Sequence, residues 1–201
     1  MKRRSMPSVN AGSMADIAFL LLIFFLVSTT IETDKGINRQ LPPLQEDDSK
    51  IVVRERNVFN VELNQLNQLL VDGKLLQVDQ LKGEIVTFLD NGGGKGETHC
   101  SYCQGQALSQ FSEHPNKAII SFKNSREANY ESYIAVQNEL VSAYQELYDR
   151  EAMRLYGMSY ETMKGQLRSV HYDGDKNALR DRMKTIEGMF PERISESQSS
   201  I

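Results

Sequence analysis

The sequence predicts an α+β protein: one N-terminal transmembrane helix, then a small α+β domain with an insertion and a helical C-terminal extension. A single long apolar run, residues 17–27, stands near the N-terminus of a chain whose mean hydropathy is −0.45. Apolar and polar residues alternate in residues 59–63, as in a half-buried strand, and apolar residues recur at helical spacing in 81–89 and 130–155. The 201 residues leave room for one small folded core after the apolar segment.

The charges of the chain argue against a nucleic-acid partner. Its 23 basic and 27 acidic residues give a formal net charge of −4. Both signs are interspersed along the chain, so the sequence offers no basic face of the kind that a nucleic-acid groove requires.

The N-terminal apolar segment has the length and charge pattern of a membrane-spanning helix. From residue 7 to residue 31 the only formally charged side chain is Asp16. At a rise of about 1.5 Å per residue, a helix of this length crosses the roughly 30 Å hydrocarbon layer of a bilayer. Because residues 2–4 are basic, the positive-inside rule places residues 1–9 in the cytoplasm, residues 10–31 in the membrane and the rest of the chain outside.

A cleaved secretory signal is the alternative interpretation of this segment, with the small residues 28–30 as its cleavage site. Two features oppose it. The basic region would be long and would reach Asp16, and threonines are a poor replacement for an Ala-x-Ala site. An uncleaved anchor fits the sequence better.

Asp16 is the candidate functional residue of the apolar segment. A central aspartate in a membrane helix costs roughly 2.5–3.5 kcal/mol on insertion scales, and a cost of this size normally has a purpose. A partner helix packed on its face would enclose the carboxylate, favour its protonated form and let it bind and release protons. The alternative is that Asp16 reaches the headgroups and only sets the depth of the helix. Apolar residues and a glycine that share its helical face are Gly12, Phe19, Leu20, Ile23 and Val27. The hydroxyl side chains that are candidates for helix packing or proton relay are Ser13, Ser28 and Thr29.

The elements beyond the membrane segment follow from periodicity and turn residues. Residues 32–50, with Gly36, two prolines and an acidic run, are expected to form an extended linker. The first predicted elements are a strand at 59–63, a hairpin joining 68–71 to 74–76 through Asp72-Gly73, and a helix at 81–90 capped by Asp79. A glycine-rich break at 91–96 ends this helix. The later predicted elements are a strand at 118–122, a helix from 130 to about 155, a tail helix within 175–188 and a frayed stretch at 195–201.

The chain has two cysteines, Cys100 and Cys103, which lie in a glycine-flanked loop. The Cys-x-x-Cys spacing suits a disulfide, a redox pair or half of a zinc site. Outside the cytoplasm a structural disulfide is the leading interpretation, because that compartment is oxidising. Zinc would need two more ligands, and the nearby histidines are His99 and His114.

No other pattern points to catalysis. The sequence contains no hydrolase nucleophile elbow, P-loop or convincing triad, and His171 stands alone in a polar stretch. We therefore expect neither an enzyme nor a bound cofactor or metal. An extracytoplasmic thiol enzyme that uses Cys100 and Cys103 is the remaining catalytic alternative.

The N-terminal residues carry a family resemblance. The stretch 10–29 places an asparagine six residues before Asp16 and an apolar Leu-Leu-Ile-Phe run after it, and Gly-Ile at 36–37 and Leu-Pro-Pro at 41–43 follow in order. This arrangement resembles the ExbD/TolR family of biopolymer transport proteins. It differs at residues 12–13, where Gly-Ser stands in place of the Thr-Pro that is common in the family.

The resemblance implies a stator or energiser subunit that depends on the proton-motive force and powers TonB-type outer-membrane transport. It implies a single-pass protein of the bacterial inner membrane, with two copies inside a ring of an ExbB/TolQ-like multi-helix partner and a TonB-like energy transducer. Residues 51–150 would then form the periplasmic domain, with an insertion near 91–116, and residues 151–201 a C-terminal extension. The alternative function is a membrane-anchored periplasmic binding or scaffold protein that conducts no protons.

Overall fold

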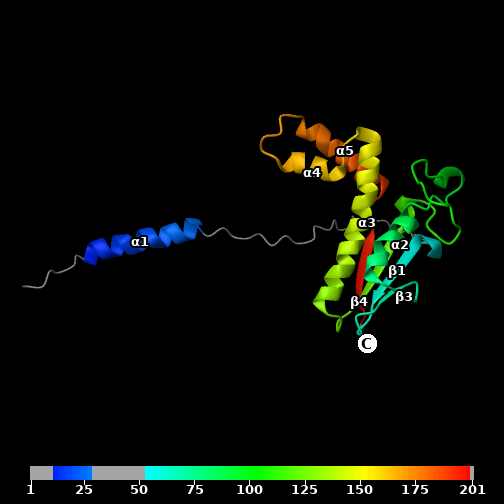
Figure 1. Cartoon of the computed structure of the whole chain (residues 1–201), viewed down its shortest axis with the longest axis horizontal. Coiled ribbons are helices and arrows are strands. Elements are labelled where there is room, and N and C mark those ends of the chain that lie inside the picture. Colours follow the sequence, from blue (N-terminus) through cyan, green and yellow to red (C-terminus); the bar gives the residue numbers. More distant parts are fainter. Residues whose placement is uncertain (1–10, 29–52, 200–201) are drawn as a thin grey trace, which may run out of the picture. The chain divides into compact units, whose positions relative to one another are not determined.

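The computed structural model describes residues 11–28 and 53–199 of the chain. These residues belong to two separate units, residues 1–41 and residues 42–201. The described part of the first unit is one helix, α1 (Ala11–Ser28) (Figure 1). The elements of the second unit are, in chain order, β1 (Val58–Leu63), β2 (Leu69–Val71), β3 (Lys74–Leu76), α2 (Val78–Leu89), β4 (Ile119–Ser125), α3 (Tyr130–Tyr156), α4 (Tyr160–Arg168), α5 (Lys176–Met189) and β5 (Ile194–Ser199), with 3-10 turns at Glu55–Asn57, Gly96–Thr98 and Pro115–Lys117.

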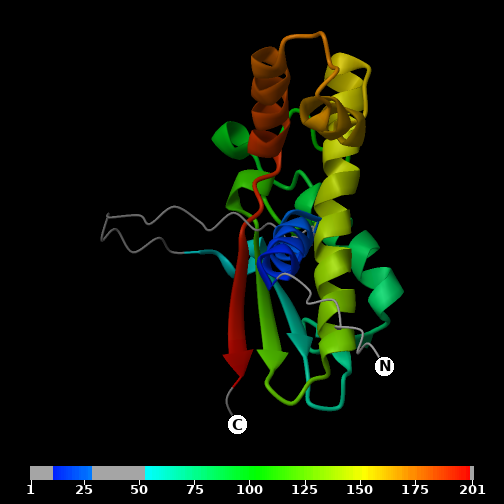
Figure 2. The same ribbon diagram turned by 90° about the vertical axis from the view of Figure 1, so that its left-hand side faces the viewer.

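The five strands among the described residues form one mixed sheet in the order β3-β2-β1-β4-β5. β2 pairs antiparallel with β1 and with β3, whereas β4 lies between β1 and β5 and runs parallel to both (Figure 2). Parallel neighbours need crossover connections, and the segments that contain α2 and α3 supply them. The predicted α+β class is therefore confirmed for the second unit.

One face of the sheet is covered by helices and holds the core. Phe59 of β1 lies beside Ile120 of β4 in the parallel register, and these two side chains and Phe122 are at most 2% exposed. The ring of Phe59 lies against Phe88 of α2, and the ring of Phe122 stacks on Tyr133 of α3. Both helices thus cover the same face, and alternate side chains of β1 point to solvent, which explains the period of two in its sequence.

β2 and β3 form the hairpin that the sequence predicts. Asp72 and Gly73 occupy the turn with φ values of 46° and 79°, the left-handed conformation that a tight two-residue hairpin turn requires. The Asp72 Oδ1 accepts hydrogen bonds from the amide and the side chain of Asn60 at 3.3 and 3.2 Å. The turn is thereby tied to β1.

The predicted helices of the second unit are present, with a difference at the start of α2. This helix begins at Val78, and Asp79 lies in its first turn. The prediction that Asp79 caps the helix is wrong. A carboxylate in the first turn still stabilises the helix, because its negative charge interacts favourably with the helix dipole. At α3 the N-cap is Asn129, whose side-chain oxygen accepts a hydrogen bond from the Ser132 amide at 2.7 Å. This helix ends before Gly157, which adopts a left-handed φ of 65°.

The strand β5 corrects the prediction for the end of the chain. The sequence predicts a frayed stretch at 195–201, which is wrong for its first five residues because β5 pairs with β4 along its whole length; the last two lie outside the described residues. Ile194 is the one apolar residue of β5, so no alternation indicates a strand. Glu196 accepts hydrogen bonds from Tyr133 and Gln137 of α3 at 2.9 and 3.2 Å. Within the predicted C-terminal extension, the chain after α3 is therefore a pair of helices followed by a return to the sheet.

The segment between α2 and β4, which the sequence predicts to be an insertion and which keeps that name below, is held in place by side chains that bond to its backbone. The buried Asn91 donates to the carbonyls of Leu108 and Ser112 and accepts from the Leu108 amide, at 2.8 to 2.9 Å. Arg56, which precedes β1, donates to the carbonyls of Leu108 and Phe111. These bonds satisfy backbone groups that the loop would otherwise leave unpaired away from water.

Asp90, at the C-cap of α2, forms the buried ion pair that joins the insertion to α3. The two guanidinium Nη atoms of Arg150 donate to the two carboxylate oxygens at 2.5 and 2.9 Å, and the Gln104 amide donates to one of them at 3.2 Å. The side chains of Asp90 and Arg150 are 8% and 26% exposed. Arg150 also donates to the fully buried Glu151 at 3.1 Å, and Arg154 donates to Glu151 from the next turn at 2.7 Å.

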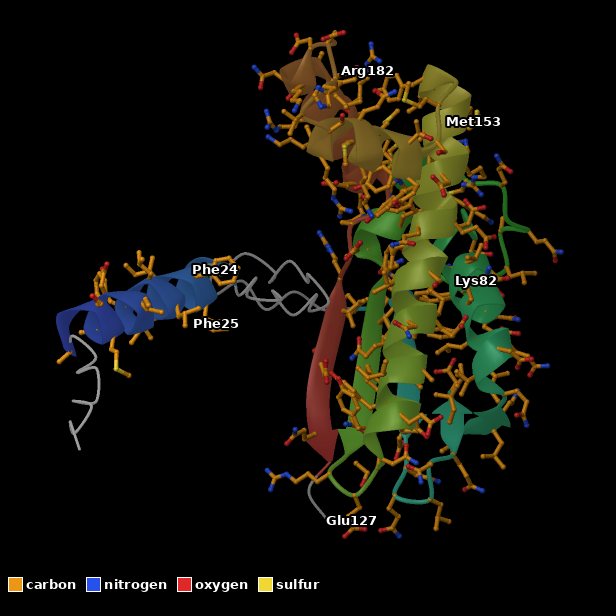
Figure 3. The ribbon with its side chains drawn as sticks, turned by 60° about the vertical axis from the view of Figure 1, so that its left-hand side comes forward. Phe24, Phe25, Lys82, Glu127, Met153 and Arg182 are labelled. Atoms are coloured by element: carbon orange, nitrogen blue, oxygen red, sulfur yellow. A yellow bond between two sulfur atoms is a disulfide. The ribbon has the colours of Figure 1, made fainter. Side chains whose placement is uncertain are left out.

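Replacing Arg150 with alanine should lower the free energy of unfolding by about 3 kcal/mol, because it leaves the buried Asp90 carboxylate without its cation. Chemical denaturation of the full chain in detergent measures this change. The matched control is Lys82→Ala, at a residue of α2 that Figure 3 labels. It breaks the Lys82–Glu146 pair, whose side chains are 42% and 52% exposed. This control should cost at most about 1 kcal/mol. Equal losses in the two variants would contradict the role given to the buried pair.

Candidate functional site

Helix α1 exposes apolar side chains around its whole circumference. Every described side chain from residue 11 to residue 25 is exposed. Phe24 and Phe25 are 62% and 61% exposed and project from the helix in different directions (Figure 3). A helix that is apolar all round buries its side chains against lipid or against other helices, because none of its faces suits water.

Asp16 is the sixth residue of α1 and its one formally charged residue. Ser13 lies one turn before Asp16, and Phe19 and Leu20 lie one turn after it, so all four share one face of the helix. Ser13 therefore offers the nearest side-chain hydroxyl on that face. The remaining residues of the face offer apolar surface to whatever packs there.

The other site residues predicted for this segment lie at or beyond the end of α1. Ser28 is the last residue of the helix. Thr29 lies outside the described residues, as do residue 10 and residues 30–31 of the predicted crossing. Among the residues that the structure describes, no helix is both long enough and apolar enough to cross a membrane.

In the second unit, Cys100 and Cys103 form a disulfide within the insertion. Cys100 is 5% exposed, and its Sγ accepts a hydrogen bond from the Cys103 amide at 3.1 Å. Gly92 packs closely on this turn, since a Cβ at that position would lie 2.9 Å from the Cβ of Cys103. The glycine-rich stretch thus leaves room for the disulfide beside the end of α2.

Two histidines lie near the disulfide. His114 accepts a hydrogen bond from the Asn116 amide through its Nδ1 at 3.1 Å. Burial lowers the pKa of His114, and the positive charges of Lys117 and His99 lower it further. Within the described ranges no group of three or more His, Cys, Asp or Glu residues is arranged so that it could hold a metal ion.

Tyr102, between the two cysteines, contacts the end of α5. Its hydroxyl donates to the Met189 carbonyl at 2.7 Å, and its ring meets the rings of Phe190 and His114 edge-on, with centroids 5.4 and 5.8 Å apart. Burial raises the pKa of Tyr102 to about 12, and nearby carboxylates add to the shift. The hydroxyl therefore remains a hydrogen-bond donor at physiological pH.

A shallow hollow lies beside β5, where α3 begins. Its one carboxylate, Glu196, already accepts hydrogen bonds from Tyr133 and Gln137. The hollow brings together no nucleophile and base. The residues that line it are Asn124, Ala128, Tyr130, Tyr133, Glu196 and Gln198.

Sequence reasoning missed the pairs that organise the insertion. Tyr102 and Met189 are 87 residues apart, and Asp90 and Arg150 are 60 residues apart. Each residue has an unremarkable local context, such as an aspartate after a helix or an aromatic residue between cysteines. No local pattern could have paired them.

A protein-family model matches most of the chain. The family model for the biopolymer transport protein ExbD/TolR matches residues 2–147, a region that contains α1, the strands β1 to β4, α2 and the larger part of α3. A comparison with individual curated proteins finds no match. Since the family match covers well over half of the sequence, including the helix that carries Asp16, the chain belongs to the ExbD/TolR family of biopolymer transport proteins.

Proposed function

We propose that this chain is a proton-motive-force-dependent stator or energiser subunit that acts with an ExbB-like membrane partner to power TonB-type outer-membrane transport. ExbD/TolR is a transport family rather than an enzyme family, and its members work with membrane partners. The observation that carries the proposal is Asp16, a single carboxylate on an apolar helix whose described side chains are all exposed.

In this proposal α1 belongs to a single crossing of the bacterial inner membrane. The apolar run of residues 17–27 supports it, as do the basic residues 2–4 that precede the run. By the positive-inside rule, the N-terminus is cytoplasmic and the second unit is periplasmic.

A ring of partner helices would meet two needs of α1. It would cover apolar side chains that project in every direction, and it would offer polar groups to Asp16, which in lipid costs roughly 2.5–3.5 kcal/mol. Two copies of the chain inside such a ring would each present one carboxylate to the partner. Hydroxyls at Ser13, Ser28 and Thr29 would then pack against neighbouring helices or pass a proton to and from Asp16.

The magnitudes of the two energies involved support proton coupling. A proton that moves through 100 mV delivers about 2.3 kcal/mol, which is close to the roughly 2.5–3.5 kcal/mol that an ionised aspartate costs in the membrane. Protonation of Asp16 therefore removes an insertion cost that is about as large as the energy that one proton delivers. In this proposal the protonation state of Asp16 decides whether its face of α1 packs on an apolar or on a polar surface of the ring. The movement that follows would be passed through the second unit to a TonB-like transducer.

A membrane-anchored periplasmic scaffold without proton conduction is the second candidate. Asp16 lies only six residues into α1, near one end of the helix, from where a carboxylate can reach the headgroups and set the depth of an anchor. The two candidates differ in whether Asp16 must titrate.

The variant Asp16→Asn should keep assembly and abolish energised transport. The amide approximates the shape of the carboxylate but cannot gain or lose a proton at accessible pH, and a neutral side chain lowers the insertion cost. The variant should copurify with its multi-helix partner at near wild-type yield, while energised uptake through an outer-membrane receptor, measured in the same strain, falls to background.

Asp173→Asn is the matched control, because it makes the same chemical change at an exposed position of the second unit and should leave uptake unchanged. Asp16→Glu keeps a titratable group with a different reach and should retain part of the uptake. Normal uptake by an assembled Asp16→Asn variant would leave Asp16 as a depth marker and favour the scaffold.

External protease on spheroplasts should degrade the second unit and spare the N-terminal residues, because the basic flank holds the N-terminus in the cytoplasm. Mass spectrometry of the protected fragment measures this topology. Complete protection of the chain, or a mature protein that lacks residues 1–30, would overturn it.

A further inference from the structure

The disulfide turn, residues 100–103, holds the point at which α5 leads into β5. Tyr102 lies between the two cysteines, donates its hydroxyl hydrogen to the Met189 carbonyl at 2.7 Å and packs its ring edge-on against Phe190. Met189 is the last residue of α5, Phe190 is its C-cap, and β5 begins at Ile194. The two cysteines restrict the backbone on both sides of Tyr102 and thereby keep its ring in this position.

The two cysteines of the disulfide turn differ in exposure and in hydrogen bonding. Cys100 is 5% exposed, whereas Cys103 is partly exposed. The Cys100 Sγ accepts a hydrogen bond from the Cys103 amide at 3.1 Å. Thiol–disulfide exchange needs access to the attacked sulfur and is faster when the leaving thiolate is stabilised, which a backbone N–H donor achieves. Attack from outside therefore falls on Cys103, with Cys100 as the leaving group.

We propose that the Cys100–Cys103 disulfide is a reducible latch: a dithiol from the surrounding medium reduces it, and the reduced turn loosens the junction between α5 and β5. The latch is separate from the proton-coupled role of α1 and does not depend on it. Its co-reactant is a dithiol, such as the active site of a thiol oxidoreductase.

The exchange proceeds in two steps. A thiolate of the dithiol attacks the Cys103 Sγ, a mixed disulfide forms with Cys103, and the bond to Cys100 breaks with its electron pair leaving on the Cys100 Sγ, which takes up a proton. The second thiol of the reductant loses its proton, attacks the reductant's own sulfur in the mixed disulfide and releases Cys103, which is protonated in turn. The dithiol thus loses two electrons and two protons and becomes a disulfide, while the two cysteines gain them.

The loosening is local, because other contacts hold both sides of the junction. The Tyr148 hydroxyl of α3 donates to the Phe190 carbonyl at 2.9 Å, and the Arg193 carbonyl accepts from the Ile120 amide of β4 at 2.9 Å. The disulfide closes a very short loop, so it restricts the unfolded chain little and contributes little to global stability. Reduction should therefore act on the junction and on β5 while the rest of the second unit stays folded.

The first test identifies the attacked sulfur. The oxidised full chain in detergent is mixed with reduced glutathione, quenched with a maleimide and mapped by mass spectrometry. Glutathione is expected on Cys103, with the maleimide on Cys100. Glutathione predominantly on Cys100, or no mixed disulfide on either residue, would overturn the proposed direction of attack.

The second test measures the loosening by amide hydrogen exchange of the full chain with and without dithiothreitol. Residues 189–199 should exchange about fivefold faster after reduction, the change expected when about one hydrogen bond is lost. Residues 78–89 of α2 should keep their rate. Unchanged exchange at 189–199, or equal acceleration of both segments, would overturn the latch.

Two variants assign the effect to the turn. Tyr102→Phe removes the hydrogen bond to Met189 and keeps the ring, so its oxidised form should already exchange faster at 189–199. The double variant Cys100→Ser/Cys103→Ser should exchange at the reduced rate and ignore dithiothreitol. A response of the double variant to dithiothreitol, or wild-type exchange in oxidised Tyr102→Phe, would also overturn the proposal.

Discussion

Asp90 and Arg150 form the contact at which the parts of the second unit meet. Asp90 ends α2, Arg150 comes from the C-terminal half of α3, and the amides of Gln104 and Gly105 in the insertion donate to the side chain and the carbonyl of Asp90. The guanidinium of Arg150 also lies over the ring of Phe190, 5.7 Å from its centroid. A buried ion pair is tolerated only when its charges are well satisfied. The end of α2 and α3 therefore cannot separate without leaving a buried charge unpaired, and the insertion and Phe190 contact the same ion pair.

The parts of the fold that the sequence predicted are those whose signal is local. The turn at Asp72-Gly73 needs a left-handed backbone, which glycine accepts readily, and the alternation in β1 follows from burial on one face. β5 escaped prediction because its single apolar residue, Ile194, gives no period, and its place is set by pairing with β4 and by α3 side chains that bond to Glu196. Strand formation there is a tertiary effect, in line with the weak intrinsic preference of polar residues for strands.

The candidate sites also differ in whether neighbouring residues in the sequence were enough to identify them. Asp16 could be singled out because one charge in a long apolar run is costly wherever the run folds. What encloses Asp16 is not encoded in its own segment, since the groups that would face the carboxylate belong to another helix. Tyr102 is the opposite case: its own surroundings in the sequence gave no reason to select it, and its contacts at Met189 and Phe190 give it a role.

The segment between α2 and β4 and the end of the α4–α5 pair contact each other. Tyr160 of α4 donates to Glu187 of α5 at 2.5 Å, Tyr148 of α3 donates to the Phe190 carbonyl, and Tyr102 of the insertion donates to the neighbouring Met189 carbonyl. The family match ends at residue 147, yet the fifth strand of the sheet lies beyond it. The chain between α3 and β5 must therefore return to β4, and Tyr102 and Tyr148 bond to the backbone at the end of α5, just before β5. The position of the edge strand β5 thus depends on its pairing with β4 and on the contacts that hold the end of α5.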